Sequence, residues 1–192
     1  MKRYDLIVVG AGPAGLSAAI QAAKYGVHVA VFDENAAPGG QLFKQIHKFF
    51  GSKEHHAKIR GFNIGKELLE EAEAAGVTVH LNSVVMGLYG NKEILVNSNG
   101  ETAHYKGDAI IVAAGAMENM IPFDGWTLPG VMGAGGADIL LRSGGTLSAD
   151  KNAPVVLAGN GPLLLLLAGH LLEAGVPIAA WLDTGWGSRR IM

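Results

Sequence analysis

The stretch that decides the fold is LIVVGAGPAG, residues 6–15, in which an apolar run ends in three glycines with the spacing G-x-G-x-x-G. Glycine permits the tight turn and the close backbone approach that a pyrophosphate requires at a helix N-terminus. The longer pattern continues with Ala19 facing the sheet, Gly26 ending the helix and Val29 in the next strand. The acid Asp33 follows at the distance where a carboxylate accepts hydrogen bonds from an adenosine ribose. The stretch predicts a dinucleotide site, and a turn that only packs a helix on a strand is the alternative.

Length and composition indicate a globular chain. It has 192 residues, of which 49% are hydrophobic, enough for one or two domains with a packed core. The net charge of −2 argues against nucleic acids and anionic membranes as main partners. The sequence contains no cysteine, which excludes disulfides and thiolate metal sites within the chain. The apolar run 163–168 is too short to span a bilayer, and Asp5 interrupts the stretch that resembles a signal peptide, so we expect a cytoplasmic protein.

Hydrophobic periodicity divides the chain into two βαβ units. In the first unit we expect strands at 4–9, 27–32, 77–80 and 108–113 and helices at 13–25 and 63–75. Alternating segments at 84–89, 93–97 and 101–105 predict an antiparallel meander at about 83–106. In the second unit we expect a strand at 154–158, a helix at 162–174 and a strand at 177–182.

These elements predict an α/β fold. It is a Rossmann-like doubly wound parallel sheet with an antiparallel β-meander insert, followed by an incomplete second βαβ unit. We expect a nucleotide-binding domain at 1–120, a linker at 121–152 and an incomplete second nucleotide-binding-like domain at 153–192.

Several runs give the chain a resemblance to a known group. The glycine turn, the Gly-Gly-Gln loop at 39–41, the strand that runs into 113–116 and the second glycine fingerprint together resemble FAD-dependent oxidoreductases with two dinucleotide-binding folds, the pyridine nucleotide-disulphide oxidoreductase-like superfamily. Within it, PFDGWTLPGVM at 122–132 and VVLAGNGPLLLL at 155–166 are similar to the FAD-binding alpha subunits of opine, hydroxyproline and proline dehydrogenases, of sarcosine-oxidase-like enzymes and of hydrogen cyanide synthase. The resemblance covers essentially the whole chain but only the N-terminal half of such proteins.

The resemblance implies FAD as the cofactor and gives the site residues their roles. The pyrophosphate is assigned to Gly10, Gly12, Pro13, Ala14 and Gly15. The ribose is assigned to Asp33, with Glu34 as the competing acid one residue later. The riboflavin end is assigned to Gly39, Gly40 and Gln41, and the strand end Ala114-Gly115 is expected to pass close to the cofactor. An ordinary turn after Pro38 is the alternative for the glycine pair. Lys44 and His47, with Gln41, either reach the flavin ring or begin a polar helix.

Two departures from the wider group narrow the chemistry. The windows 39–47 and 130–147, where disulfide members hold their dithiol, contain no cysteine, so this chain alone cannot act as a disulfide or thioredoxin reductase. In the second fingerprint Leu164 replaces the third glycine, where we expect it to push the helix outward, and Asp183 falls one residue past the expected acid. We favour a packing role for this unit, with NAD(P) binding at Gly159–Gly161 as the alternative.

The histidines do not predict a metal site. His55 and His56 are adjacent, so in an extended segment their side chains point to opposite faces, and with His47 and His80 they are better explained by solvated, charged surroundings. Residues 61–66 lack the spacing of a phosphate loop. Spacing identifies no catalytic triad or carboxylate pair, so no catalytic residue is assigned.

The leading functional hypothesis is an FAD-binding oxidoreductase subunit that accepts or relays electrons in an amine, opine or amino-acid dehydrogenase complex, with the small-molecule substrate oxidised on a partner. One alternative is an NAD(P)H-dependent flavoprotein reductase. Another is a non-catalytic FAD-binding or assembly fragment, because relatives finish the FAD domain with a later Gly-Asp motif that Gly107-Asp108 does not match. We expect a partly open flavin site, exposed apolar surface around 163–172, and association with a partner subunit or a second copy.

Overall fold

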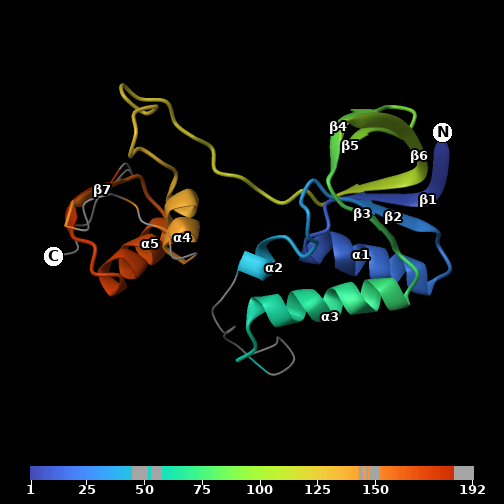
Figure 1. The fold of residues 1–192 in the computed structure, drawn as a ribbon, viewed down its shortest axis with the longest axis horizontal. Helices are drawn as coiled ribbons and strands as arrows, with labels where there is room; N and C mark the ends of the chain where they lie inside the picture. Colours follow the sequence, from blue (N-terminus) through green and yellow to red (C-terminus); the bar gives the residue numbers. More distant parts are fainter. Residues whose placement is uncertain (45–51, 53–57, 143–144, 146, 148–151, 184–192) are drawn as a thin grey trace. The chain divides into compact units, whose positions relative to one another are not determined.

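The computed structural model describes residues 1–44, 52, 58–142, 145, 147 and 152–183, which form two compact units at 1–116 and 117–192 (Figure 1). His47, His55 and His56, for which the sequence does not predict a metal role, lie outside the described residues.

The first unit contains a six-stranded sheet in the order β3-β2-β1-β6-β5-β4. Its strands are β1 (Lys2–Val9), β2 (Val29–Phe32), β3 (Thr78–His80), β4 (Ser83–Tyr89), β5 (Glu93–Ser98) and β6 (Glu101–Val112). β1 runs parallel to β2 and to β6, β2 runs parallel to β3, and β4, β5 and β6 are antiparallel. The Rossmann-like α/β fold with a meander is thereby confirmed.

One strand differs from the sequence prediction. β6 is a single strand of 12 residues, whereas the sequence pattern predicts separate strands at 101–105 and 108–113. Its first half pairs with β5 and its second half pairs with β1. Gly107 stands at the change of partner, and a Cβ there would lie 2.7 Å from the carbonyl oxygen of Ala109 and 3.3 Å from Ile7. Glycine at this position therefore permits close packing inside a continuous strand. In the sequence alone, the same residue indicates a turn.

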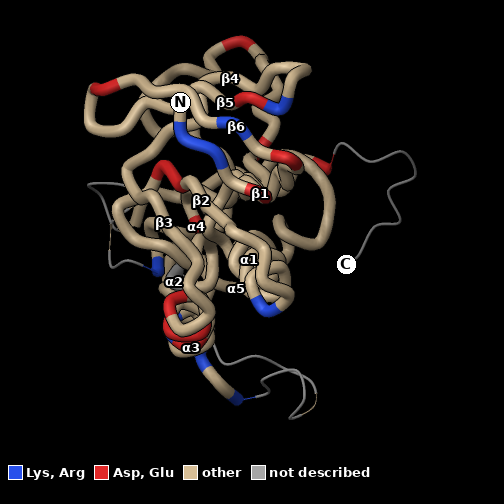
Figure 2. Tube along the Cα trace, turned by 90° about the vertical axis from the view of Figure 1, so that its right-hand side faces the viewer, with Lys and Arg blue, Asp and Glu red and all other residues tan. Residues whose placement is uncertain are grey.

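Both faces of this sheet are covered. Helices α1 (Pro13–Lys24) and α3 (Gly61–Ala74) lie side by side on one face, and the meander curls over the other (Figure 1). The helix side of the core contains Leu6, Val8, Leu16, Ile20, Val29 and Val31, and the meander side contains Tyr4, Ile7, Phe32, Ile94, Val96 and Tyr105. From residue 6 to 8 on β1 and from 29 to 32 on β2, the alternation follows from the two-residue period of a strand. Acidic residues gather on the outer helix α3 (Figure 2), where Glu71 forms a 2.7 Å salt bridge with Lys24 of α1.

The second unit is a parallel pair of strands with two helices. It comprises α4 (Ala134–Arg142), β7 (Val155–Ala158), α5 (Pro162–Glu173) and β8 (Ile178–Leu182), with β7 parallel to β8. Its core contains Ala137, Leu157, Leu164, Leu167 and Leu171. The strand–helix–strand order of β7, α5 and β8 is the second βαβ unit that the sequence predicts. Helix α4 lies inside the range 121–152, which the sequence pattern predicts to be a linker. The helix is not predicted because Gly135 and Gly136 weaken its helical pattern.

A charged clamp joins the two helices of the second unit. The Asp138 carboxylate on α4 forms a 2.5 Å salt bridge to Arg142 one turn later, and its Oδ1 lies 2.5 Å from Nδ1 of His170 on α5. All three side chains are largely buried. In the ranges that the structure describes, none of the helices has the length and apolar character needed to cross a bilayer.

Candidate dinucleotide-binding site

The glycine turn lies between the carboxyl ends of three strands. Gly10, with φ of 103°, donates its N–H to the carbonyl of Phe32 at 2.7 Å, while Ala113 donates to Val9 at 2.7 Å. A Cβ at Gly10 would collide with the carbonyl oxygen of Ala113, and a Cβ at Gly15 would collide with that of Gly10. Backbone packing therefore requires glycine at both positions.

Gly12 is a glycine for a different reason. Its φ of −74° suits any residue, and none of the described atoms lies within 4 Å of where its Cβ would be. It is half-buried, while the neighbouring Pro13 and Ala14 are exposed. There is thus open space beside the backbone of the turn at Gly12.

This open space lies at the N-terminus of α1. Gly12 is the N-cap of the helix, no described side chain caps it, and its first turn contains no acidic residue. The first N–H groups of a helix lack intrahelical partners and carry the positive end of its dipole. A diphosphate fits such a cradle in both shape and charge.

Asp33 and Glu34 have different environments. Asp33 is 7% exposed, and its Oδ2 accepts a 2.6 Å hydrogen bond from the N–H of Ala11 in the glycine turn. Its Oδ1 accepts two hydrogen bonds from Asn35, at 2.8 Å from the backbone N–H and 2.7 Å from Nδ2. Glu34 is exposed. Of the two acids, Asp33 is the one attached to the turn.

The loop 39–41 packs directly on the glycine turn. Gly39 donates its N–H to the carbonyl of Ala11 at 2.6 Å, and Gly40, with φ of 52°, would place a Cβ 3.0 Å from the Cα of Gly12. Gln41 begins the short helix α2 (Gln41–Lys44) and is exposed. The positive φ fits a turn as well as a cofactor loop, but the contact with the turn places these residues at the candidate site.

The last two predicted site residues, Ala114 and Gly115, lie at the same edge of the sheet. Ala114 and Gly115 are exposed directly after the segment that touches Gly10. The structure thus gathers the predicted site residues at the carboxyl ends of β1, β2 and β6, where doubly wound sheets bind their ligands. Asn35 is a site residue that the sequence pattern does not identify, although Asp-x-Asn is a signal for a turn in which Asp accepts from residue i+2.

The second fingerprint has a buried leucine at its third glycine position. Leu164, at the third glycine position, is 7% exposed and belongs to the core of the second unit. Its Cδ2 would lie 3.7 Å from a Cβ at Gly159. A leucine at this position is thus buried in the core of the second unit, where a glycine would allow closer packing of the helix on the strand.

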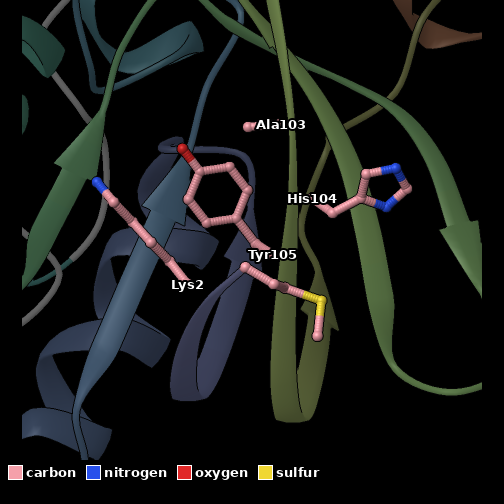
Figure 3. A pocket seen from close by; sticks show the side chains of 5 residues that line it. Lys2, Ala103, His104 and Tyr105 are labelled. Atoms are coloured by element: carbon pink, nitrogen blue, oxygen red, sulfur yellow. The ribbon is translucent and has the colours of Figure 1, made fainter.

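Two hollows lie elsewhere on the first unit. One, of about 440 Å³, is lined by Met1, Lys2, Ala103, His104 and Tyr105, with the His104 ring directed away from the Tyr105 ring (Figure 3). It adjoins the beginning of β1, at the opposite end of that strand from the glycine turn. The other, of about 480 Å³, is lined by residues that include Leu88, Tyr89 and Ile110. Both are shallow and open, and neither reaches the candidate site.

His80 belongs to an aromatic cluster under the meander. Its ring stacks on Phe32 with a centroid separation of 4.7 Å, and its Nε2 lies 3.3 Å from the Tyr4 hydroxyl. Burial lowers the pKa of His80, and Lys2 lowers it further, whereas burial and Tyr105 raise the pKa of Tyr4. Among the residues that the structure describes, no group of three potential metal ligands is found.

Comparisons with known proteins agree with this geometry. Residues 4–182 match the family model described as pyridine nucleotide-disulphide oxidoreductase. An opine oxidase component from Agrobacterium tumefaciens (strain Ach5) is 39% identical over 94% of this chain and 37% of its own length. The HcnB component of hydrogen cyanide synthase from Pseudomonas protegens is 34% identical over 90% of this chain and 37% of its own length. The alpha component of sarcosine oxidase from Corynebacterium sp. (strain P-1) is 28% identical over 91% of this chain and 19% of its own length.

A solved structure shares the fold. L-proline dehydrogenase from P. horikoshii superposes with a TM-score of 0.70 at 18% identity, over 95% of this chain and 36% of that protein. The chain therefore spans less than two-fifths of the length of the relatives it matches.

Proposed function

The chain belongs to the pyridine nucleotide-disulphide oxidoreductase family, and from that premise we propose that it is an FAD-binding oxidoreductase subunit. In this proposal it accepts or relays electrons within a complex that oxidises amines, opines or amino acids. The names of its relatives support the proposal, because they are subunits of opine oxidase, hydrogen cyanide synthase and sarcosine oxidase.

The observation that carries the proposal is the space beside Gly12. Gly10 and Gly15 are explained by backbone packing, but Gly12 has a conformation open to other residues and no described neighbour where its Cβ would be. A glycine that the fold does not need is explained by a ligand that requires the space. The uncapped helix N-terminus beside it favours a diphosphate.

The other residues extend this cradle over the rest of the cofactor. In the proposal Asp33 accepts from the adenosine ribose beside Ala11, and Gly40 and Gln41 approach the riboflavin end. FAD, when bound, supplies the two-electron chemistry, while these residues hold and orient it. Because the chain has no cysteine, electron transfer does not pass through a dithiol of its own.

The reductase alternative receives less support. Binding of NAD(P)H at the second fingerprint requires close approach to its turn, and the third glycine position there holds the bulkier Leu164. Rapid mixing of FAD-loaded protein with NADH or NADPH separates the two functions. We expect no fast bleaching of the flavin, and fast bleaching favours the reductase.

A partner polypeptide also belongs to the proposal. On α5 the side chains of Leu163, Leu165, Leu166 and Leu172 are exposed, as expected for 163–172. The strand residues Val156, Trp181 and Leu182 are exposed as well, although parallel sheets are normally covered on both faces. An apolar polypeptide surface, from a partner subunit or a second copy, would cover these residues.

The cradle can be tested with Gly12→Ala and Gly12→Val. Both variants are expected to fold with unchanged circular dichroism, because the backbone and the space admit a side chain. FAD affinity, measured by quenching of flavin fluorescence, should fall about tenfold or more, since the new side chain occupies the diphosphate space. Gly169→Ala, an exposed glycine in α5, is the matched control and should bind FAD as the natural chain does. Full FAD affinity in Gly12→Val would exclude this cradle as the cofactor site.

A further inference from the structure

Asp33 has little acceptor capacity left for a ligand. A carboxylate offers about four lone-pair sites, two on each oxygen. Asn35 fills both positions on Oδ1 with its backbone N–H at 2.8 Å and its Nδ2 at 2.7 Å. The N–H of Ala11 fills one position on Oδ2 at 2.6 Å. One acceptor position therefore remains, on Oδ2, next to the glycine turn.

Asn35 is itself held from a second direction. Its carbonyl accepts a 3.1 Å hydrogen bond from the N–H of Asn82, at the turn between β3 and β4. The backbone of Asp33 is tied to the same region, because it donates to His80 at 2.9 Å and accepts from Ser83 at 2.8 Å. Asn35, which donates to the Asp33 carboxylate, is thus hydrogen-bonded to the segment that joins β3 to β4.

We propose that Asn35 is a positioning residue, which saturates Oδ1 of Asp33 and thereby directs the one remaining acceptor of that carboxylate toward the adenosine ribose of FAD. The inference rests on the proposed FAD site and adds a residue to it. Asn35 touches the carboxylate and not the cofactor. Without its amide, Oδ1 regains a lone pair, the carboxylate can rotate about its Cβ–Cγ bond, and water competes for it.

Two substitutions separate positioning from bulk effects. Asn35→Ala removes Nδ2 and keeps the backbone donor, so the dissociation constant for FAD should rise about tenfold. Asn35→Asp keeps the shape but sets an oxygen against Oδ1, so its loss should be larger. Asn91→Ala, an exposed asparagine in the turn after β4, is the matched control and should leave FAD affinity unchanged. FMN, which has no adenosine, should bind the natural chain and both Asn35 variants equally, which a general loosening of the site would not allow.

A double-substitution cycle on the 192-residue chain decides whether Asn35 acts through Asp33. In the Asp33→Ala background, Asn35→Ala should cause no further loss of FAD affinity. Additive losses would overturn the inference, because Asn35 would then act independently of the carboxylate. Full FAD affinity in Asn35→Ala, together with lost affinity in Asp33→Ala, would also overturn the inference. That result would not contradict the proposed FAD site. FAD binding by neither the natural chain nor any variant overturns the proposed function and this inference together.

Discussion

At the scale of single residues, His80 shows how position sets charge. It lies on β3, and its ring is near those of Phe32 and Tyr105, with centroid separations of 4.7 Å and 5.9 Å. The Tyr4 hydroxyl on β1 lies 3.3 Å from its Nε2, and the positive charge of Lys2 on the same strand acts on it. An imidazolium is poorly solvated in these surroundings, so the pKa of His80 in the folded chain lies below its ordinary value near 6.5.

Acidification should therefore destabilise the first unit through His80. Above about pH 6.5 both the folded and the unfolded chain carry a neutral imidazole, and this contribution to stability is complete. As the pH falls below that value, the unfolded chain takes up the proton first, and the free energy of unfolding falls by up to about 1.4 kcal/mol per pH unit for one group. Urea unfolding between pH 7.5 and 5.5 measures this slope.

His80→Gln should flatten the pH dependence, whereas His104→Gln, at an exposed histidine on β6, should not. An unchanged slope in His80→Gln would assign the acid sensitivity to other groups.

The glycine turn shows how far sequence goes at this scale. The spacing locates all three glycines and the acid, but it does not say that Gly10 and Gly15 serve the fold while Gly12 faces open space. Asn35 could not be assigned because a side chain that acts through a neighbouring carboxylate has no periodicity of its own. Its role depends on distances that appear only when β2, β3 and the turn come together.

At the scale of elements, α4 and α5 are joined by the Asp138 clamp. The carboxylate binds Arg142 and His170 at once, and all three side chains are mostly removed from water. Replacing this carboxylate by an amide removes its charge and one of its two acceptor oxygens, which costs more here than the loss of an exposed ion pair.

Asp138→Asn should loosen the packing of α4 on α5. We expect the free energy of unfolding of the second unit to fall by about 1–3 kcal/mol. Hydrogen exchange measures this locally, because amides of α4 should lose protection while those of α1 in the first unit keep theirs. Asp124→Asn, at an exposed aspartate, serves as the control. Unchanged protection in α4 would mean that apolar contacts alone hold the helices together.

The elements were predictable where the pattern is strong. Helices at 13–25 and 63–75 correspond to α1 and α3, and the strands of the second unit match to within a residue or two. The failures have physical causes. Two adjacent glycines weaken the sequence pattern of α4, so this helix is not predicted. Gly107 makes the pattern predict two strands, although pairing with neighbouring strands keeps β6 extended on both sides of that residue.

At the scale of the whole molecule, the main feature is the apolar surface of the second unit. Helix α5 carries both exposed and buried leucines. Leu165 is 60% exposed on α5, whereas Leu164 beside it is 7% exposed. A helix that is apolar on nearly all sides is normally buried on all sides. This helix therefore has more apolar surface than its own unit covers.

Leu165→Glu should reduce association without unfolding the chain. We expect the mass measured by light scattering to fall toward that of a 20.0 kDa monomer, with an unchanged melting temperature. Leu164→Ala is the contrasting variant, because it should cost about 2–5 kcal/mol of unfolding free energy while leaving the exposed surface in place. Monomeric behaviour of the natural chain would contradict a second copy as the occupant of this surface.

The continuous strand β6 has one more consequence for the first unit. Along its first half it carries the hydrogen bonds of the meander, and along its second half those of β1, the strand that leads into the glycine turn. Fraying of one half removes support from the other. We therefore expect the meander and the strands around the glycine turn to open together as one cooperative unit, with matched hydrogen-exchange protection on β5 and β1.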